Sequence, residues 1–189
     1  RTLRLKKLKI NHQLQNLMEI KEIFETMVYG PAPETATPAI DYLEAHKRSF
    51  DLFINGEWTK PNSKKYIDSH NPANKEFLAK IAEADAKDVD KAVKAAKDAQ
   101  ENWMKIGGFE RAKYLYAIAR QIQKHARLFA VLETLDNGKP IRETRDIDIP
   151  IVIRHFYHHA GWAKLKDSEL RDYKEVGVIG QIIPWNFPL

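Results

Sequence analysis

The residue whose type and position most favour chemistry is Asn186. Residues 176–183 form a nearly continuous apolar run, which is typical of a strand buried on both faces of a parallel sheet. Ligands of open α/β sheets collect beyond the carboxyl ends of such strands. Here the run ends at Pro184 and is followed by Trp185 and Asn186. The sequence therefore predicts a site at this point, with the Asn186 amide as its polar group.

Several other site chemistries have no counterpart in the sequence. The chain contains no cysteine, which excludes disulfides, thiolate zinc sites and a cysteine nucleophile within these residues. It has no phosphate loop and no Gly-x-Ser-x-Gly nucleophile elbow. Gly177 and Gly180 lack the third glycine of the dinucleotide fingerprint. A nicotinamide cofactor therefore cannot be inferred from the glycines.

Three histidines could share one face of a helix, because His155, His158 and His159 are three and four residues apart. No cysteine or carboxylate nearby completes a ligand set, and the neighbouring aromatic residues favour a helix packed in a core. We therefore expect no metal site.

The charge pattern favours neither nucleic acid nor membrane as a partner. The net charge of +5 comes from the basic start of the chain, and beyond residue 9 the acidic and basic residues balance. A nucleic-acid surface would instead cluster its basic residues on the folded body. No apolar run approaches the roughly 20 residues of a membrane helix. The basic start lacks the serines of a mitochondrial presequence and soon reaches Glu19 and Glu22, so we expect a cytoplasmic protein.

The elements that would position the site begin with helices and short strands. Apolar residues at three- and four-residue steps predict an amphipathic helix over 10–27, and the Pro-rich stretch 30–38 predicts a connector. The dipeptide Asn55-Gly56, flanked by aromatic and β-branched residues, predicts a hairpin with a type I′ turn. We further expect a short helix over 40–46, extended segments over 65–70 and 76–82, and one small antiparallel sheet that joins the extended segments to the hairpin.

The apolar period then changes from two to 3.6 residues, which predicts a layer of helices. Asp85 and Asp88 form a variant of the capping box at the start of the first, and its apolar stripe runs from Val89 to Trp103. Gly107 and Gly108 separate it from the second. The second helix carries apolar residues over 112–122. The third carries them over 128–135 and is expected to end at Asn137-Gly138 and Pro140. A fourth runs from Pro150 to Lys164. We expect all these apolar faces to lie in the core.

Residues 176–189 resemble the signature segment of the aldehyde dehydrogenases. They read Val-Gly-Val-Ile-Gly-Gln-Ile-Ile-Pro-Trp-Asn-Phe-Pro-Leu, a motif too long to recur readily by chance. The resemblance covers the chain from about Phe50 to Leu189. Residues 23–34 resemble the leader of the long two-module branch known as family sixteen. Further family-like pieces occur in the same order at 53–58, 71–73, 132–140 and 156–163.

The resemblance implies a fold and a reaction. The fold would be α/β, the N-terminal part of the aldehyde dehydrogenase fold, with helices, a small antiparallel sheet and the first strand of a Rossmann-like parallel sheet. Residues 1–49 would be an N-terminal helical extension, and residues 50–189 a truncated NAD-binding domain. The reaction would oxidise an aldehyde to a carboxylic acid with NAD or NADP, through a thiohemiacetal on a cysteine thiolate, and a glutamate would activate the water that releases the acid.

The resemblance also implies roles for residues of this chain. Asn186 falls on the family's oxyanion-hole asparagine, a task that suits an amide because it donates a hydrogen bond and does not give up a proton. Ile183, Pro184 and Trp185 fall, with Asn186, on positions that line the family's cofactor site. For each of these residues, packing at the end of a strand is the alternative interpretation.

Departures from the family pattern limit what these residues could do alone. The family's catalytic cysteine and glutamate lie downstream of this segment, so we expect a front fragment that is inactive by itself. The stretch from Ala163 to Val176 is shorter than in tetrameric members, so a homodimer of the full-length protein is expected. Two alternatives stay open: an inactive scaffold with the aldehyde dehydrogenase fold, and a stand-alone helical interaction module.

Overall fold

The computed structural model describes residues 35–189. The chain divides into two units, residues 1–33 and residues 34–189. The helix predicted over 10–27, the first part of the connector and the family-sixteen-like leader lie outside the described residues. The predicted boundary at residue 49 stays a prediction.

The short helix predicted near residue 40 is confirmed as α3, Thr37–Ala45. Pro38 sits in its first turn, where the missing N–H removes no helical hydrogen bond. Ala39 and Leu43 are buried on one face. Leu43 packs with Leu78 in a small apolar cluster, so α3 belongs to the core of this unit.

The predicted hairpin is confirmed. Strands β2 (Leu52–Ile54) and β3 (Glu57–Thr59) pair antiparallel, with Ile54 opposite Glu57. Asn55 and Gly56 both have positive φ, 54° and 80°, which is the conformation that a type I′ turn demands and that Asn-Gly adopts readily.

The single antiparallel sheet predicted from the sequence is wrong in its connections. The hairpin β2–β3 is a separate two-stranded sheet. Strand β5 (Phe77–Ala82) pairs antiparallel with β4 (Tyr66–His70) on one side and parallel with β1 (Ser49–Phe50) on the other. A contact between residues 49–50 and 80–81 is non-local, and no periodicity in the sequence reports it.

Two predicted helix boundaries, the start of the first helix at Asp85 and the end of the third at Gly138, are confirmed. Helix α4 (Ala86–Lys105) starts with a complete capping box, in which the Asp85 side chain accepts from the Asp88 N–H and the Asp88 side chain accepts from the Asp85 N–H. Helix α6 ends at the left-handed Gly138, as C-terminal glycines commonly do. The remaining elements are α5 (Gly108–Lys124), α6 (Ala126–Asn137), α7 (Ile141–Glu143), the π-helical turn η1 (Thr144–Asp148) and α8 (Ile149–Glu169).

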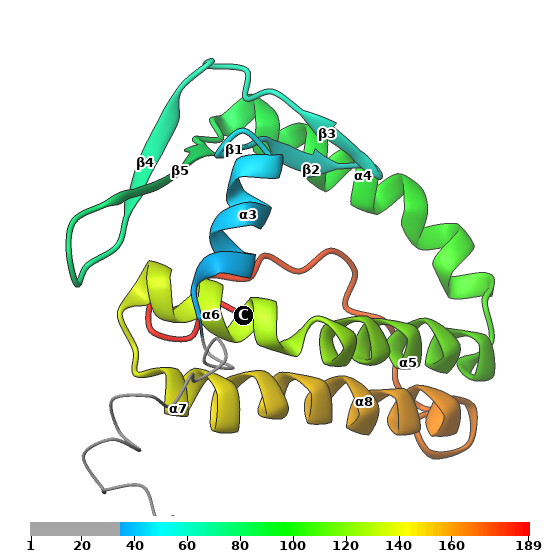
Figure 1. Ribbon diagram of the computed structural model, residues 1–189. Coiled ribbons are helices and arrows are strands. Elements are labelled where there is room, and N and C mark those ends of the chain that lie inside the picture. The colour runs from blue at the N-terminus through cyan, green and yellow to red at the C-terminus, as the bar shows by residue number, and fades with distance from the viewer. Residues whose placement is uncertain (1–34) are drawn as a thin grey trace, which may run out of the picture. The chain divides into compact units, whose positions relative to one another are not determined.

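Helices α5 and α8 lie side by side along most of their lengths (Figure 1) and make the most extensive contact between helices. The two helices approach closely at Gly108, whose N–H donates to the Asp167 carboxylate at 3.2 Å. A Cβ atom built on Gly108 would lie 2.2 Å from the backbone carbonyl oxygen of Ala163. Glycine is therefore required here by the neighbouring helix.

Gly108→Ala is expected to lower the free energy of unfolding by about 1–3 kcal/mol, because the two helices must separate to admit the methyl group. Gly161→Ala is the matched control on α8, since a Cβ atom there meets nothing within 4 Å and alanine favours a helix interior by about 1 kcal/mol over glycine. Urea unfolding followed by circular dichroism measures both. Equal stability of the two variants would contradict the packing argument.

The strand predicted over 176–183 is not formed. Beyond α8 the structure assigns no strand or helix to residues 170–189. No other described segment pairs with residues 176–183, so a run suited to a parallel sheet remains irregular chain without a ladder. We refer to residues 176–183 as the unpaired segment. Its side chains are correspondingly uncovered, with Val176 88% and Ile182 99% exposed.

The prediction that the apolar stripe of α4 lies in the core is wrong within the described residues. Val89 and Trp103 are 53% and 40% exposed, and Asp88 is the one residue of the helix that is buried. Residues 177–179 of the unpaired segment line a pocket against this helix. The stripe and the unpaired segment therefore form adjoining apolar surface.

None of the helices in the part of the chain that the structure describes is long and apolar enough to cross a membrane.

Candidate functional site

The predicted site lies in a tight turn directly after the unpaired segment, residues 176–183. The Phe187 N–H donates to the carbonyl oxygen of Pro184 at 3.1 Å, which closes the turn around Trp185 and Asn186. Trp185 is 87% exposed, and Asn186 is exposed as well. We refer to residues 184–187 as the amide turn.

Asn186 takes part in the structure through its backbone alone. Its carbonyl oxygen accepts a hydrogen bond from the Lys139 ammonium at 3.2 Å. No hydrogen bond joins its side-chain amide to another residue in the range 35–189. The amide donors are therefore uncommitted within the described chain.

The four site residues predicted from the sequence are contiguous, and the structure places all of them at or beside the amide turn. Ile183 is about half exposed, Trp185 is almost fully exposed, and Pro184 is exposed too. None is buried in strand-end packing. Their roles toward a cofactor stay predictions.

Lys139 is a site residue that the sequence reasoning missed. Its ammonium forms an ion pair with Asp148, contacts the Asn186 carbonyl and lies 3.9 Å from the centre of the Phe187 ring. It therefore joins the start of α8 to the amide turn. The available signal is its place in the family-like motif 132–140, which by itself indicates no role for the lysine.

Two carboxyl groups beside Lys139 are buried. Glu133 and Asp148 each have 6% of their surface exposed. Burial, followed by a hydrogen bond with Asp148 and the negative charge of Asp148, raises the pKa of Glu133 to about 7, although the charge of Lys139 acts in the opposite direction. One oxygen of Glu133, Oε2, has no hydrogen-bond partner. The Glu133 carboxyl group therefore keeps its proton to a higher pH than an exposed glutamate does, and Lys139 is paired with Asp148.

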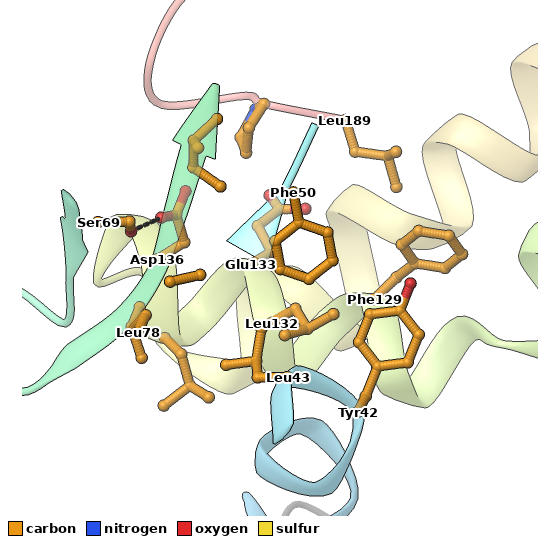
Figure 2. Close-up of a pocket in the computed structure, with 14 residues that line it drawn as sticks. Tyr42, Leu43, Phe50, Ser69, Leu78, Phe129, Leu132, Glu133, Asp136 and Leu189 are labelled. Carbon is orange, nitrogen blue, oxygen red and sulfur yellow. Dashed lines mark hydrogen bonds between the residues drawn. The ribbon is translucent and has the colours of Figure 1, made fainter. Parts of the chain in front are cut away.

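An apolar groove of about 440 Å³ lies beside this cluster (Figure 2). Aromatic side chains from three elements, Tyr42, Phe50 and Phe129, gather over Leu132 in its wall. Its polar groups are few, and one of them, Asp136, is engaged by the Ser69 hydroxyl at 2.6 Å. Pro188 and Leu189 also line the groove, so residues that follow the amide turn lie against α6. The end of the chain beside α6 is visible in Figure 1.

The three histidines occupy α8 without converging on one point. The His159 ring is hydrogen bonded to the His155 carbonyl at 2.8 Å, and the Trp162 indole donates to His158 Nε2 at 3.0 Å. Across residues 35–189 no group of three or more metal-ligating side chains is found.

Comparison with known proteins identifies the relatives of this chain. Residues 58–189 match the model of the aldehyde dehydrogenase family. An aldehyde dehydrogenase from Vibrio cholerae serotype O1 is 38% identical over 173 residues, which is 86% of this chain and 33% of that protein. The chain thus spans about a third of the length of the curated relatives it matches.

Solved structures agree with this relationship. The NAD⁺ complex of an aldehyde dehydrogenase from Bacillus cereus superposes with a TM-score of 0.61 at 38% identity, covering 64% of this chain and 25% of that one. Betaine aldehyde dehydrogenase from Staphylococcus aureus, also in complex with NAD⁺, gives a TM-score of 0.63 at 32% identity, covering 68% and 25%. The α/β architecture predicted from the sequence, as the N-terminal part of this fold, is confirmed.

Proposed function

The chain belongs to the aldehyde dehydrogenase family, and from this premise we propose that it forms the front part of an enzyme that oxidises an aldehyde to a carboxylic acid with NAD or NADP. When bound, the nicotinamide cofactor accepts the hydride. The proposal is supported by the family match over residues 58–189 and by the NAD⁺ complexes of two similar proteins. The residues of this chain contribute binding and charge stabilisation to the reaction.

Asn186 would stabilise the oxyanion. Attack of a thiolate on an aldehyde turns the carbonyl oxygen of the substrate into the alkoxide of a thiohemiacetal, and a donor held beside it lowers the barrier. The observation that carries the proposal is the amide turn. A hydrogen bond from Phe187 to Pro184 closes the turn, Lys139 holds the Asn186 carbonyl, and the side-chain donors of Asn186 are left uncommitted within the described chain. An amide there donates to the alkoxide without transferring a proton.

The residues around Asn186 fit a nicotinamide cofactor. Trp185 and Ile183 present exposed apolar surface next to the amide, and Pro184 adds a rigid apolar ring. Pockets for such ligands combine apolar walls with a few fixed polar groups. These three side chains would hold the nicotinamide ring and its ribose close to Asn186.

A dimeric assembly and a cytoplasmic location complete the proposal. Helix α8 continues to Glu169, so residues 170–175 alone separate it from the apolar segment. This stretch is too short for the oligomerisation hairpin expected of tetrameric members. It therefore supports a homodimer.

Aldehyde-dependent formation of NADH or NADPH, followed by absorbance at 340 nm, tests the function. The natural protein, at the length that the cell produces, is expected to be active with at least one aldehyde of a broad panel. The 189-residue chain alone is expected to be inactive, because it holds no cysteine. Activity of the chain alone, or cofactor binding without turnover in the natural protein, would overturn the proposal. The second result would instead favour the inactive scaffold.

A further inference from the structure

Lys139 connects three parts of the chain that are distant in sequence. Its ammonium is paired with Asp148 at the start of α8 and hydrogen bonded to the backbone carbonyl of Asn186, 47 residues away. It also lies over the ring of Phe187, the last residue of the amide turn. One cation thus makes three favourable contacts, two of them with the turn.

Lys139 is itself held in place from both ends. Its backbone N–H donates to the Asn137 side chain at 2.8 Å, directly after the left-handed Gly138 that ends α6. Its side chain is 16% exposed, so little of it is free to move into solvent. The position of the ammonium is therefore set by the end of α6 and the start of α8.

The amide turn makes few other hydrogen bonds within the described residues. Its internal hydrogen bond runs from Phe187 to Pro184, and the segment before it has no sheet partner among the described residues. Among the described residues, Lys139 is the hydrogen-bond donor that joins the Asn186 backbone to the folded body. A shift of about 1 Å in a catalytic donor costs up to about 100-fold in rate, so this attachment matters for the proposed reaction.

We propose that Lys139 is a positioning residue, which holds the amide turn against the ends of α6 and α8 and so fixes the direction of the Asn186 amide. This inference rests on the function proposed above. Lys139 touches neither substrate nor cofactor, and it acts through the Asn186 backbone. The ion pair with Asp148 does not by itself require a contact between the Lys139 ammonium and the Asn186 carbonyl, and the structure has both.

Hydrogen exchange of the amide turn tests the contact directly. In the 189-residue chain at low micromolar concentration, the C-terminal peptic peptide reports few amides, because Pro184 and Pro188 have none. Lys139→Met is expected to accelerate exchange at Phe187 about tenfold, since a charge-assisted hydrogen bond and a cation–π contact are lost. Lys139→Arg keeps the charge and the donors, and should restore most of the protection.

Lys113→Met is the matched control. Lys113 also pairs with a carboxylate, Glu110 at 2.7 Å, and also lies over a phenylalanine, Phe109 at 4.8 Å, but it belongs to α5. Its replacement should leave exchange of the amide turn unchanged. Equal acceleration in both variants, or no acceleration in Lys139→Met, would show that Lys139 does not hold the turn.

A double variant tests the alternative explanation that Lys139 affects the turn only by neutralising the charge of Asp148. Lys139→Met combined with Asp148→Asn leaves neither buried charge unpaired, so it also protects against failure of the single variant to fold. Fast exchange in the double variant supports the proposal. Slow exchange would contradict it, because the turn would then be held without Lys139.

The kinetic arm uses the natural protein. Lys139→Met should lower kcat about tenfold and change the KM of the cofactor less than about threefold, because a misplaced oxyanion donor affects the transition state more than ground-state binding. Fast exchange with unchanged kcat would refute the positioning role. Absence of activity in the unmodified natural protein would instead refute the proposed function, and the exchange result would still decide whether Lys139 holds the turn.

Discussion

Replacing Asn186 with alanine is expected to lower kcat for aldehyde oxidation by the natural protein by about 10²- to 10³-fold. The physical reason is the loss of one preorganised donor to the developing alkoxide, an interaction that is stronger in the transition state than in the ground state. Removal of a single donor of this kind typically costs about 3 kcal/mol of transition-state stabilisation. The measurement is steady-state kinetics at saturating cofactor.

Folding should be unaffected by this change, since the Asn186 side chain is exposed and bonds to no residue that the structure describes. The thermal midpoint of Asn186→Ala should therefore match that of the unmodified protein. Asn102→Ala, which removes an exposed amide on α4, serves as the control and should keep full activity. A loss of less than about threefold in Asn186→Ala would remove the oxyanion role, because a true donor contributes far more.

Glu133→Gln is expected to flatten the pH dependence of stability by about 3 kcal/mol between pH 5 and pH 8. Burial raises the pKa of Glu133 from 4.5 to about 7 in the folded protein, so the folded state binds the proton more tightly than the unfolded state does. Each pKa unit corresponds to about 1.36 kcal/mol. Glutamine has no proton to lose, so the variant avoids the cost of ionising a carboxyl group in this buried place.

The direction follows from proton linkage. Below pH 4.5 the carboxyl group is protonated in both states, and the favourable contribution of its proton is fully present. As pH rises from 4.5 to about 7, the unfolded chain loses the proton first and this contribution disappears. At pH 8 the variant should therefore be more stable than the unmodified chain, with a smaller difference at pH 5.

Urea unfolding at pH 5, 6.5 and 8 measures the effect on the 189-residue chain. Glu143→Gln, at an exposed position on α7, controls for the removal of a surface charge. Parallel stability curves for Glu133→Gln and the unmodified chain would mean that Glu133 ionises normally. The proposed effect of burial on the pKa of Glu133 would then be ruled out.

Local features of the fold could be predicted because their causes are local. The Asn55-Gly56 turn depends on two residues that accept positive φ, and the start of α4 depends on side chains three residues apart at Asp85 and Asp88. The stop of α6 at Gly138 is of the same kind. In each case the interacting atoms are neighbours in sequence, so the residue types are sufficient evidence.

Features that depend on distant partners could not be predicted in this way. The parallel pairing of β1 with β5 joins residues about thirty positions apart and leaves no periodic signal. The apolar pattern of α4 and of 176–183 indicates a need for burial, but not which surface provides it. Both remain exposed within the described residues.

The residues of the candidate site also fall into a group that could be predicted from the sequence and a group that could not. Asn186 and its neighbours could be predicted because a single contiguous motif contains them. Lys139, Asp148 and Glu133 could not, because their importance comes from meeting across the ends of α6 and α8. A buried glutamate in particular has no sequence signature, since most glutamates are exposed.

Residues 176–183 lead directly into the amide turn, and their backbone has no ladder partner among the described residues. A strand that paired with them would engage these backbone groups and immobilise the entrance to the turn. Under the proposed function, the direction of the Asn186 amide would then depend on that pairing as well as on Lys139.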